Sequence, residues 1–236
     1  MNDVRVCADA AAVAENAAHF IADFVKTRPT ANVLVATGNT PIPTYEALAR
    51  LHPDMSKTTA IQLDEYLVPE GDARTLYGWM ARAYLTPLGV ERALRFDLSD
   101  ADHEKMCRAH VQAIADAGGI DLAILGLGPN GHLGFSEPPS SADAPTRAVT
   151  LTPESLRSNA PYWDGAQVPS RAVTVGMDLI LSARKTLLLV TGPHKRNILR
   201  RTLYGPVTPD VPASYLQRAK LILMTDQDVG SGVAGD

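Results

Sequence analysis

Short apolar runs alternate with helical patterns along the chain, and this alternation constrains the fold more than any other feature of the sequence. Most positions in each run are apolar, so both faces of a strand built from it would be buried. Such strands are typical of a parallel sheet that helices cover on both faces. We therefore expect an α/β, Rossmann-like fold with a mostly parallel sheet. The predicted strands are residues 33–36, 60–63, 122–125, 172–175, 187–190 and 221–224.

Two of the intervening helices have recognisable start signals. Thr40 precedes Pro41, and a capping hydroxyl followed by a fixed proline φ is typical of a helix N-terminus. A second helix is predicted to begin near Ser99, with acidic residues in its first turns, and to end at Gly118 and Gly119. Both helices flank predicted strands, as the alternating pattern requires.

The sequence indicates one domain spanning residues 1–236, because no internal repeat or low-complexity linker divides it. Residues 140–170 differ from the rest: they are rich in Pro, Ser and Asp, and they hold one short strand candidate at 147–151. A segment of this length is expected to act as a lid over a binding site. Residues 229–236 are glycine-rich and are predicted to form a flexible tail.

Composition excludes two classes of partner. The chain has 22 Lys and Arg against 26 Asp and Glu, a net charge of −4, and no basic block is interleaved with aromatic residues. Nucleic acid is therefore not an expected partner. The apolar runs are far shorter than the ~20 residues that span a bilayer, and no basic region followed by an apolar stretch begins the chain. We expect a cytoplasmic protein.

The first chemical motif is the turn Thr37, Gly38, Asn39 and Thr40, at a predicted strand end and helix start. Gly38 leaves backbone N–H groups unobstructed, the helix N-terminus adds partial positive charge, and the threonine hydroxyls can donate hydrogen bonds. Together these groups suit a phosphate. An ordinary strand-to-helix turn remains the alternative, since the motif is not the Walker pattern.

Two adjacent acids, Asp64 and Glu65, directly follow the second apolar strand. The carboxyl ends of parallel strands form the ligand crevice of an open α/β sheet, so an acid there is placed to act as a base. A helix cap or a surface ion pair is the alternative interpretation.

The third motif, residues 125–138, is the most informative. Four glycines in nine residues would bring backbone close to a ligand, and they surround His132, with Asn130 and Glu137 near enough to orient its ring. A lone histidine is more often structural, but the conformational cost of the glycines favours a functional one.

A fourth turn, residues 190–195, places Lys195 at the start of a predicted helix. A lysine there opposes the helix dipole, so a phosphate partner would explain its position. A solvated lysine is the alternative.

In their order and spacing, these motifs resemble the glucosamine-6-phosphate deaminase/isomerase family, whose relatives include galactosamine-6-phosphate deaminases and, more distantly, 6-phosphogluconolactonases. The resemblance spans nearly the whole chain. It rests on residues 36–41, 63–66 and 128–138, Val173 to Gly176, and Val211 to Ser214.

The resemblance implies a reaction and its catalytic residues. An aminosugar 6-phosphate is opened, its C2 proton moves to C1, and ammonia leaves. Asp64 would carry the C2 proton, and Glu65 would support the structure instead. His132 would shuttle the ring-opening proton, held and polarised by Glu137. Asn130 stands where relatives carry Asp or Asn, and as Asn it can orient the ring but share no charge with it.

For the phosphate, the resemblance implies the turn at residues 37–40 together with Lys195. Relatives also use a lid arginine at a position where this chain has Pro161. Proline offers neither charge nor donor. We expect Arg157 to substitute, with Arg147 and Arg171 as alternatives.

Four functions remain open at this point. Glucosamine 6-phosphate is the leading substrate, and galactosamine 6-phosphate is the alternative. The two sugars differ in the configuration of one hydroxyl, which one or two hydrogen bonds would distinguish. Lactone hydrolysis, as in 6-phosphogluconolactonases, and non-catalytic sensing of a sugar phosphate are less favoured. No cofactor or metal is implied, because Gly126 to Gly128 lacks the rest of a dinucleotide motif and no ligand cluster is evident. A monomer or dimer is expected.

Overall fold

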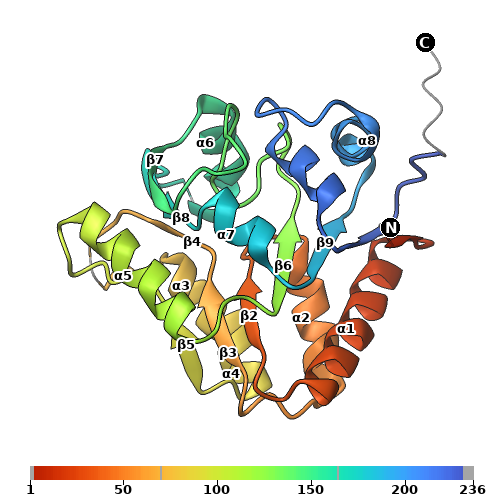
Figure 1. Cartoon of the computed structure of the whole chain (residues 1–236), viewed down its shortest axis with the longest axis horizontal. Coiled ribbons are helices and arrows are strands. Elements are labelled where there is room, and N and C mark those ends of the chain that lie inside the picture. The colour runs from red at the N-terminus through yellow and green to blue at the C-terminus, as the bar shows by residue number, and fades with distance from the viewer. Residues whose placement is uncertain (1–2, 70, 164, 231–236) are drawn as a thin grey trace.

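A seven-stranded parallel sheet forms the centre of the computed structural model, which describes residues 3–69, 71–163 and 165–230 (Figure 1). The strand order is β1-β10-β9-β6-β2-β3-β5, and all neighbouring strands pair in parallel. The strands are β1 (Asp3–Val6), β2 (Asn32–Val35), β3 (Thr59–Gln62), β5 (Arg92–Leu94), β6 (Leu122–Gly126), β9 (Thr186–Val190) and β10 (Leu221–Thr225). The predicted α/β class is confirmed.

Helices cover both faces of this sheet (Figure 1). One face packs against α1 (Ala10–Thr27), α2 (Pro41–Arg50), and the helical segment made of α3 (Leu76–Met80), the π-helical turn Ala81–Leu85 and α4 (Thr86–Leu88). The other face packs against α5 (His103–Asp116), α7 (Met177–Ser182), α8 (Arg196–Tyr204) and the 3-10 helix Pro212–Arg218.

The alternation of side chains along β2 explains this arrangement. Val33 and Val35 join the core on the α1 and α2 side, whereas Leu34 joins the core on the α5 side, and all three are fully buried. Successive side chains of a strand point to opposite faces, so a continuous apolar run requires cover on both.

The strand order changes direction between β2 and β6. From β2 the chain runs outward to β3 and β5, then returns to place β6 on the other side of β2 and continues to β9 and β10. A crevice opens outside the carboxyl ends of the strands at such a switch point. The turns at residues 36–41 and 126–137 leave β2 and β6 at this crevice.

A second, antiparallel sheet of three strands lies at the same end of the molecule. Its order is β4 (Asp64–Tyr66), β8 (Arg171–Thr174) and β7 (Arg147–Thr150). Run 172–175 is thus a strand, but its predicted place in the parallel sheet is wrong. Its Ala172 packs in a separate aromatic cluster with Tyr66, Phe135 and Trp163, which gives these residues a core of their own.

One predicted helix start and one predicted helix cap need correction. The second helix, α5, begins at His103, because Asp102 accepts hydrogen bonds from the backbone N–H groups of Glu104 and Lys105 and so caps it. The earlier Ser99 belongs to a turn in which its hydroxyl donates to Asp97. Helix α2 does begin at Pro41, but the Thr40 side chain makes no capping hydrogen bond.

The predicted tail is anchored at its start. Val229 is 2% exposed, and its carbonyl accepts a hydrogen bond from Arg200 of α8. Residue 229 thus contacts α8, residues 231–236 lie outside the described residues, and the flexibility of the tail stays a prediction. Within the part of the chain that is described, no helix is long and apolar enough to cross a membrane.

Candidate active site

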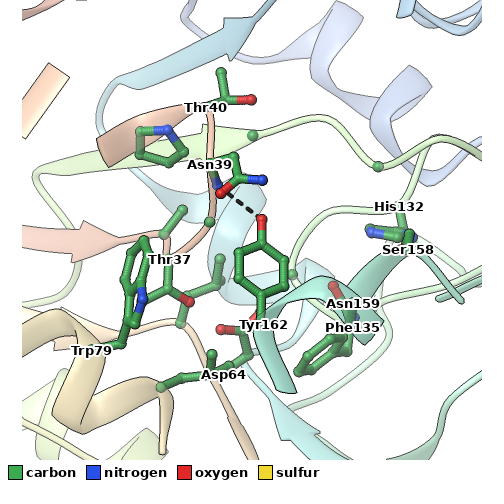
Figure 2. Close-up of a pocket in the computed structure, with 18 of the residues that line it drawn as sticks. Thr37, Asn39, Thr40, Asp64, Trp79, His132, Phe135, Ser158, Asn159 and Tyr162 are labelled. Atoms are coloured by element: carbon green, nitrogen blue, oxygen red, sulfur yellow. Dashed lines mark hydrogen bonds between the residues drawn. The ribbon is translucent and has the colours of Figure 1, made fainter. Parts of the chain in front are cut away.

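The four sequence motifs meet at one pocket of about 640 Å³ at the carboxyl ends of β2, β3, β6 and β9. This volume suits a small molecule rather than a macromolecule. Figure 2 shows Thr37, Asn39, Asp64 and His132 around the pocket, with Tyr162 between them. Of the predicted site residues, seven line it: Thr37, Gly38, Asn39, Thr40, Asp64, His132 and Lys195.

Asp64 is a buried acid at the pocket wall. The residue is 7% exposed, and within the described residues its buried Oδ1 has no hydrogen-bond partner. Burial, followed by the charge of Glu65, raises the pKa of Asp64 to about 8, and the Thr37 hydroxyl beside it opposes the shift (Figure 2). A carboxyl with a pKa near neutrality can accept and return a proton, as a catalytic base must.

The neighbouring acid has a different task. The Glu65 carboxylate accepts hydrogen bonds from the backbone N–H groups of Tyr66, Leu76 and Tyr77 and from the Gln62 side chain. It thereby joins β4 to the start of α3. The structural role expected for Glu65 is confirmed.

The ring of His132 lies directly against Gly128. A Cβ added at Gly128 would overlap Cδ2, Nε2 and Cγ of that ring, so only glycine allows this approach. Burial lowers the pKa of His132 to about 4, with Lys195 adding to the effect and Glu137 opposing it. The imidazole is therefore neutral at pH 7, when one ring nitrogen can donate a proton and the other can accept one.

Glu137 and Asn130 lie next to His132 but do not line the pocket. Within the described residues, Glu137 Oε1 and His132 Nδ1 are both buried without a hydrogen-bond partner, while Glu137 Oε2 accepts from the backbone N–H of Thr152. Asn130 Oδ1 accepts from the backbone N–H of His132 at 3.3 Å. It thus holds the turn, and the structure does not place it on the imidazole as expected.

The small sheet fixes Asp64 relative to the histidine turn. Asp64 is paired with Thr174 across β4 and β8. The Thr174 hydroxyl accepts a hydrogen bond from the backbone N–H of Phe135, three residues after His132. A Cβ at Gly134, where φ is +57°, would stand 2.7 Å from that hydroxyl, so the turn can approach β8 only as glycine.

The turn of residues 37–40 forms a further wall of the pocket and runs from Thr37, beside Asp64, to Thr40 (Figure 2). The Tyr45 hydroxyl donates to the carbonyl of Ala36 at 2.8 Å and supports the turn from beneath. The backbone N–H of Asn39 donates to the hydroxyl oxygen of Tyr162 at 3.1 Å (Figure 2). Lys195 reaches this wall from the start of α8 and donates to the carbonyl of Leu127 at 2.7 Å.

The structure does not bring the three expected substitute arginines to the pocket lining. Arg157 is exposed on α6 (Pro153–Asn159). Arg147 donates to Ser140 and to the carbonyl of Pro145, and Arg171 contacts His103.

Two other arginines, Arg74 and Arg82, do line the pocket. Arg74 is paired with Asp72 and stacks on the Trp163 ring at 4.6 Å, whereas Arg82 projects from the π-helical turn. The sequence analysis missed both, as it missed Trp79 and Tyr162. The spacing of Leu76, Trp79 and Arg82 on one helical face was the available signal.

Among the residues that the structure describes, no three His, Cys, Asp or Glu side chains lie close enough to hold a metal ion.

Comparison with known proteins agrees with this geometry. Residues 7–224 match the family model described as glucosamine-6-phosphate isomerases/6-phosphogluconolactonase. A protein named glucosamine-6-phosphate deaminase from Rhodopirellula baltica is 37% identical over 92% of this chain and 89% of its own length. One of the same name from Streptomyces avermitilis is 39% identical over 91% of this chain and 86% of its own length.

Solved structures give the same result. A structure described as a monomeric glucosamine-6-phosphate deaminase superposes with a TM-score of 0.89 at 32% identity, covering 94% of this chain and 96% of that one. The 6-phosphogluconolactonase of Thermotoga maritima superposes with a TM-score of 0.73 at 20% identity over 95% of this chain and 99% of that one, which is a likeness of fold. The chain therefore belongs to the family of glucosamine-6-phosphate isomerases and 6-phosphogluconolactonases.

Proposed function

We propose that this protein is an aminosugar-6-phosphate deaminase/isomerase that converts glucosamine 6-phosphate to fructose 6-phosphate and ammonia. The observation that carries the proposal is the placement of the buried Asp64, with its raised pKa, and the neutral His132 in one pocket that the Thr37 to Thr40 turn also lines. The names of the relatives at 37% and 39% identity support the same substrate.

His132 opens the sugar ring in this proposal. Opening a hemiacetal removes the proton of the C1 hydroxyl and delivers one to the ring oxygen, and a neutral imidazole can do both. The carboxylate of Glu137 stabilises the imidazolium that forms transiently, since its charge raises the pKa of His132. Glu137 acts through the histidine and is a positioning residue.

Asp64 then transfers the proton from C2 to C1. The carboxylate removes the C2 proton of the open-chain aldehyde while O1 takes a proton from the substrate's own ammonium group, which leaves an enolamine, and Asp64 then returns its proton to C1. The product carries an iminium at C2, and addition of water there releases ammonia and the ketose 6-phosphate. The burial that raises the pKa of Asp64 makes the carboxylate a stronger base once it is ionised.

The phosphate is held at the turn of residues 37–40. The backbone N–H groups of Gly38 and Thr40 and the N-terminus of α2 bind it, and Lys195 supplies a positive charge. Residues 140–170, which contain β7 and α6, act as the lid of a single domain (Figure 1). We further propose a small-molecule substrate and a cytoplasmic location, which are compatible with the net charge of −4. A monomeric state is proposed because one structural relative is described as monomeric.

The experiment that tests the proposal is ammonia release from the purified protein, given glucosamine 6-phosphate and galactosamine 6-phosphate in parallel. Ammonia from the first sugar is expected. Ammonia only from the second would assign the epimer that gives tagatose 6-phosphate. If neither sugar releases ammonia and the protein hydrolyses 6-phosphogluconolactone, the proposal is contradicted. If the protein acts on none of the three compounds, a non-catalytic sensor of a sugar phosphate replaces the proposal.

A further inference from the structure

Tyr162 brings a hydroxyl from the lid to the phosphate-binding turn. It lies in the 3-10 helix Ala160–Trp163, directly after Pro161, and its hydroxyl oxygen is 3.1 Å from the backbone nitrogen of Asn39, 123 residues away in the sequence. Figure 2 shows the ring standing between Thr37, Asn39 and Asp64, with the hydroxyl aimed at the turn. The lid therefore reaches the phosphate end of the pocket through this side chain.

The hydroxyl has a hydrogen left to donate. In its bond with Asn39 the tyrosine oxygen accepts, so its own O–H is not used there. Burial of the partly buried ring raises the pKa of Tyr162, so the hydroxyl keeps its proton at neutral pH. A phosphate oxygen bound beside the Asn39 N–H would lie within reach of that O–H.

Tyr162 is the lid residue that is bonded to the turn. Pro161 has no side-chain donor and no backbone N–H, and Arg157, one helix earlier, does not line the pocket. Ser158, Asn159 and Trp163 of the lid also line the pocket, but within the described residues the hydrogen bond between lid and turn is made by Tyr162.

We propose that Tyr162 is the lid's phosphate-binding residue, and that its O–H donates to a phosphate oxygen of the substrate where relatives place an arginine. The proposal rests on the proposed function for its substrate. The neutral hydroxyl of Tyr162 takes the place of a charged arginine guanidinium. The positive charge around the phosphate then comes only from Lys195 and the pocket arginines.

Substitution of Tyr162 by phenylalanine removes only the hydroxyl. Titration calorimetry with glucitol 6-phosphate, which has no carbonyl and cannot react, and with inorganic phosphate measures binding without turnover. We expect the Kd of both to rise roughly tenfold, the effect of one hydrogen bond to a charged group. With glucosamine 6-phosphate, KM should rise by a similar factor while kcat stays within about twofold.

Tyr204→Phe is the matched control, because it removes an exposed tyrosine hydroxyl that donates to Gly230 at 2.9 Å and does not line the pocket. It should leave every constant unchanged. Unchanged Kd values in Tyr162→Phe would overturn the proposal, and tighter binding would do so too, because the hydroxyl would then only block the Asn39 N–H. The calorimetry needs no ammonia release, so its outcome is separate from that of the proposed function.

Discussion

The imidazole of His132 rests on the backbone of Gly128, in a space that any Cβ would fill. Gly128→Ala must therefore displace the ring. Because general acid–base catalysis contributes about 10²–10⁴-fold, we expect kcat to fall by roughly 100-fold or more, with the free energy of unfolding little changed. Steady-state kinetics and urea unfolding measure the two effects.

Gly126→Ala is the comparison for that variant, since Gly126 also lines the pocket but a Cβ there would meet no atom within 4 Å and would not displace His132. It should keep its kcat, with any change confined to KM. Wild-type kcat in Gly128→Ala would show that the position of His132 is not needed for turnover.

The pKa of Asp64 sets the pH dependence of the reaction. With this pKa raised to about 8, the carboxyl is mostly protonated at pH 7, and the basic form becomes dominant above pH 8. We expect kcat/KM to rise with pH through a limb near 8, distinct from the second ionisation of the sugar phosphate near pH ~6. A pH–rate profile from 5.5 to 9.5 tests this, and a profile that is flat above pH 6.5 would speak against Asp64 as the base.

Because its pKa is raised in the folded protein, an ionised Asp64 lowers the free energy of unfolding. Its folded pKa of about 8 exceeds the unfolded value of ~3.9, so its contribution is most favourable below pH 4 and is lost as pH rises through 8. Asp64→Asn, which cannot ionise, should therefore gain stability relative to the wild type by on the order of 2–5 kcal/mol between pH 4 and pH 9. Urea unfolding of both proteins across that range measures the gain, and parallel curves would refute the shift.

Glu65 is expected to act on stability. Its carboxylate satisfies three backbone N–H groups and the Gln62 amide, so Glu65→Gln replaces charged acceptors by a group that can satisfy fewer donors. We expect a loss of about 2–3 kcal/mol in the free energy of unfolding. Loss of kcat at wild-type stability would instead place Glu65 in the chemistry.

Pro161→Arg restores a charged donor next to Tyr162. If the phosphate site lacks its lid arginine, KM should fall roughly tenfold, the effect of one charged contact to phosphate. Arg157→Ala should leave KM unchanged, because Arg157 is exposed outside the pocket. An unchanged KM in Pro161→Arg would mean that Arg74 or Arg82 already provides the contact.

Some of this architecture follows from sequence alone, and some does not. The apolar run at 33–36 predicts a strand buried on both faces because that property is local, and β2 confirms it. Run 172–175 has the same local pattern, but it pairs with β4 and β7, and strand partners are a property of the whole fold. The start of α5 was misplaced because several acids could cap it, and only the backbone geometry selects Asp102.

The candidate site divides in the same way. Asp64, His132 and Lys195 were found because each lies shortly after the end of a parallel strand, and strand ends converge in a parallel sheet. Tyr162 and Arg82 were missed because they reach the pocket from helical turns, and Arg74 because it reaches the pocket from the turn before α3, and no local pattern gives the orientation of these segments. Asn130 was placed correctly in the turn, but its oxygen bonds to the backbone of His132, a choice that depends on the turn's conformation.

The most direct test of the central claim compares ammonia release from glucosamine 6-phosphate by the wild-type protein and by Asp64→Asn. We expect release by the wild type and none by the variant, while the variant still binds glucitol 6-phosphate. Absence of ammonia from the wild type, or equal release from the variant, would contradict it.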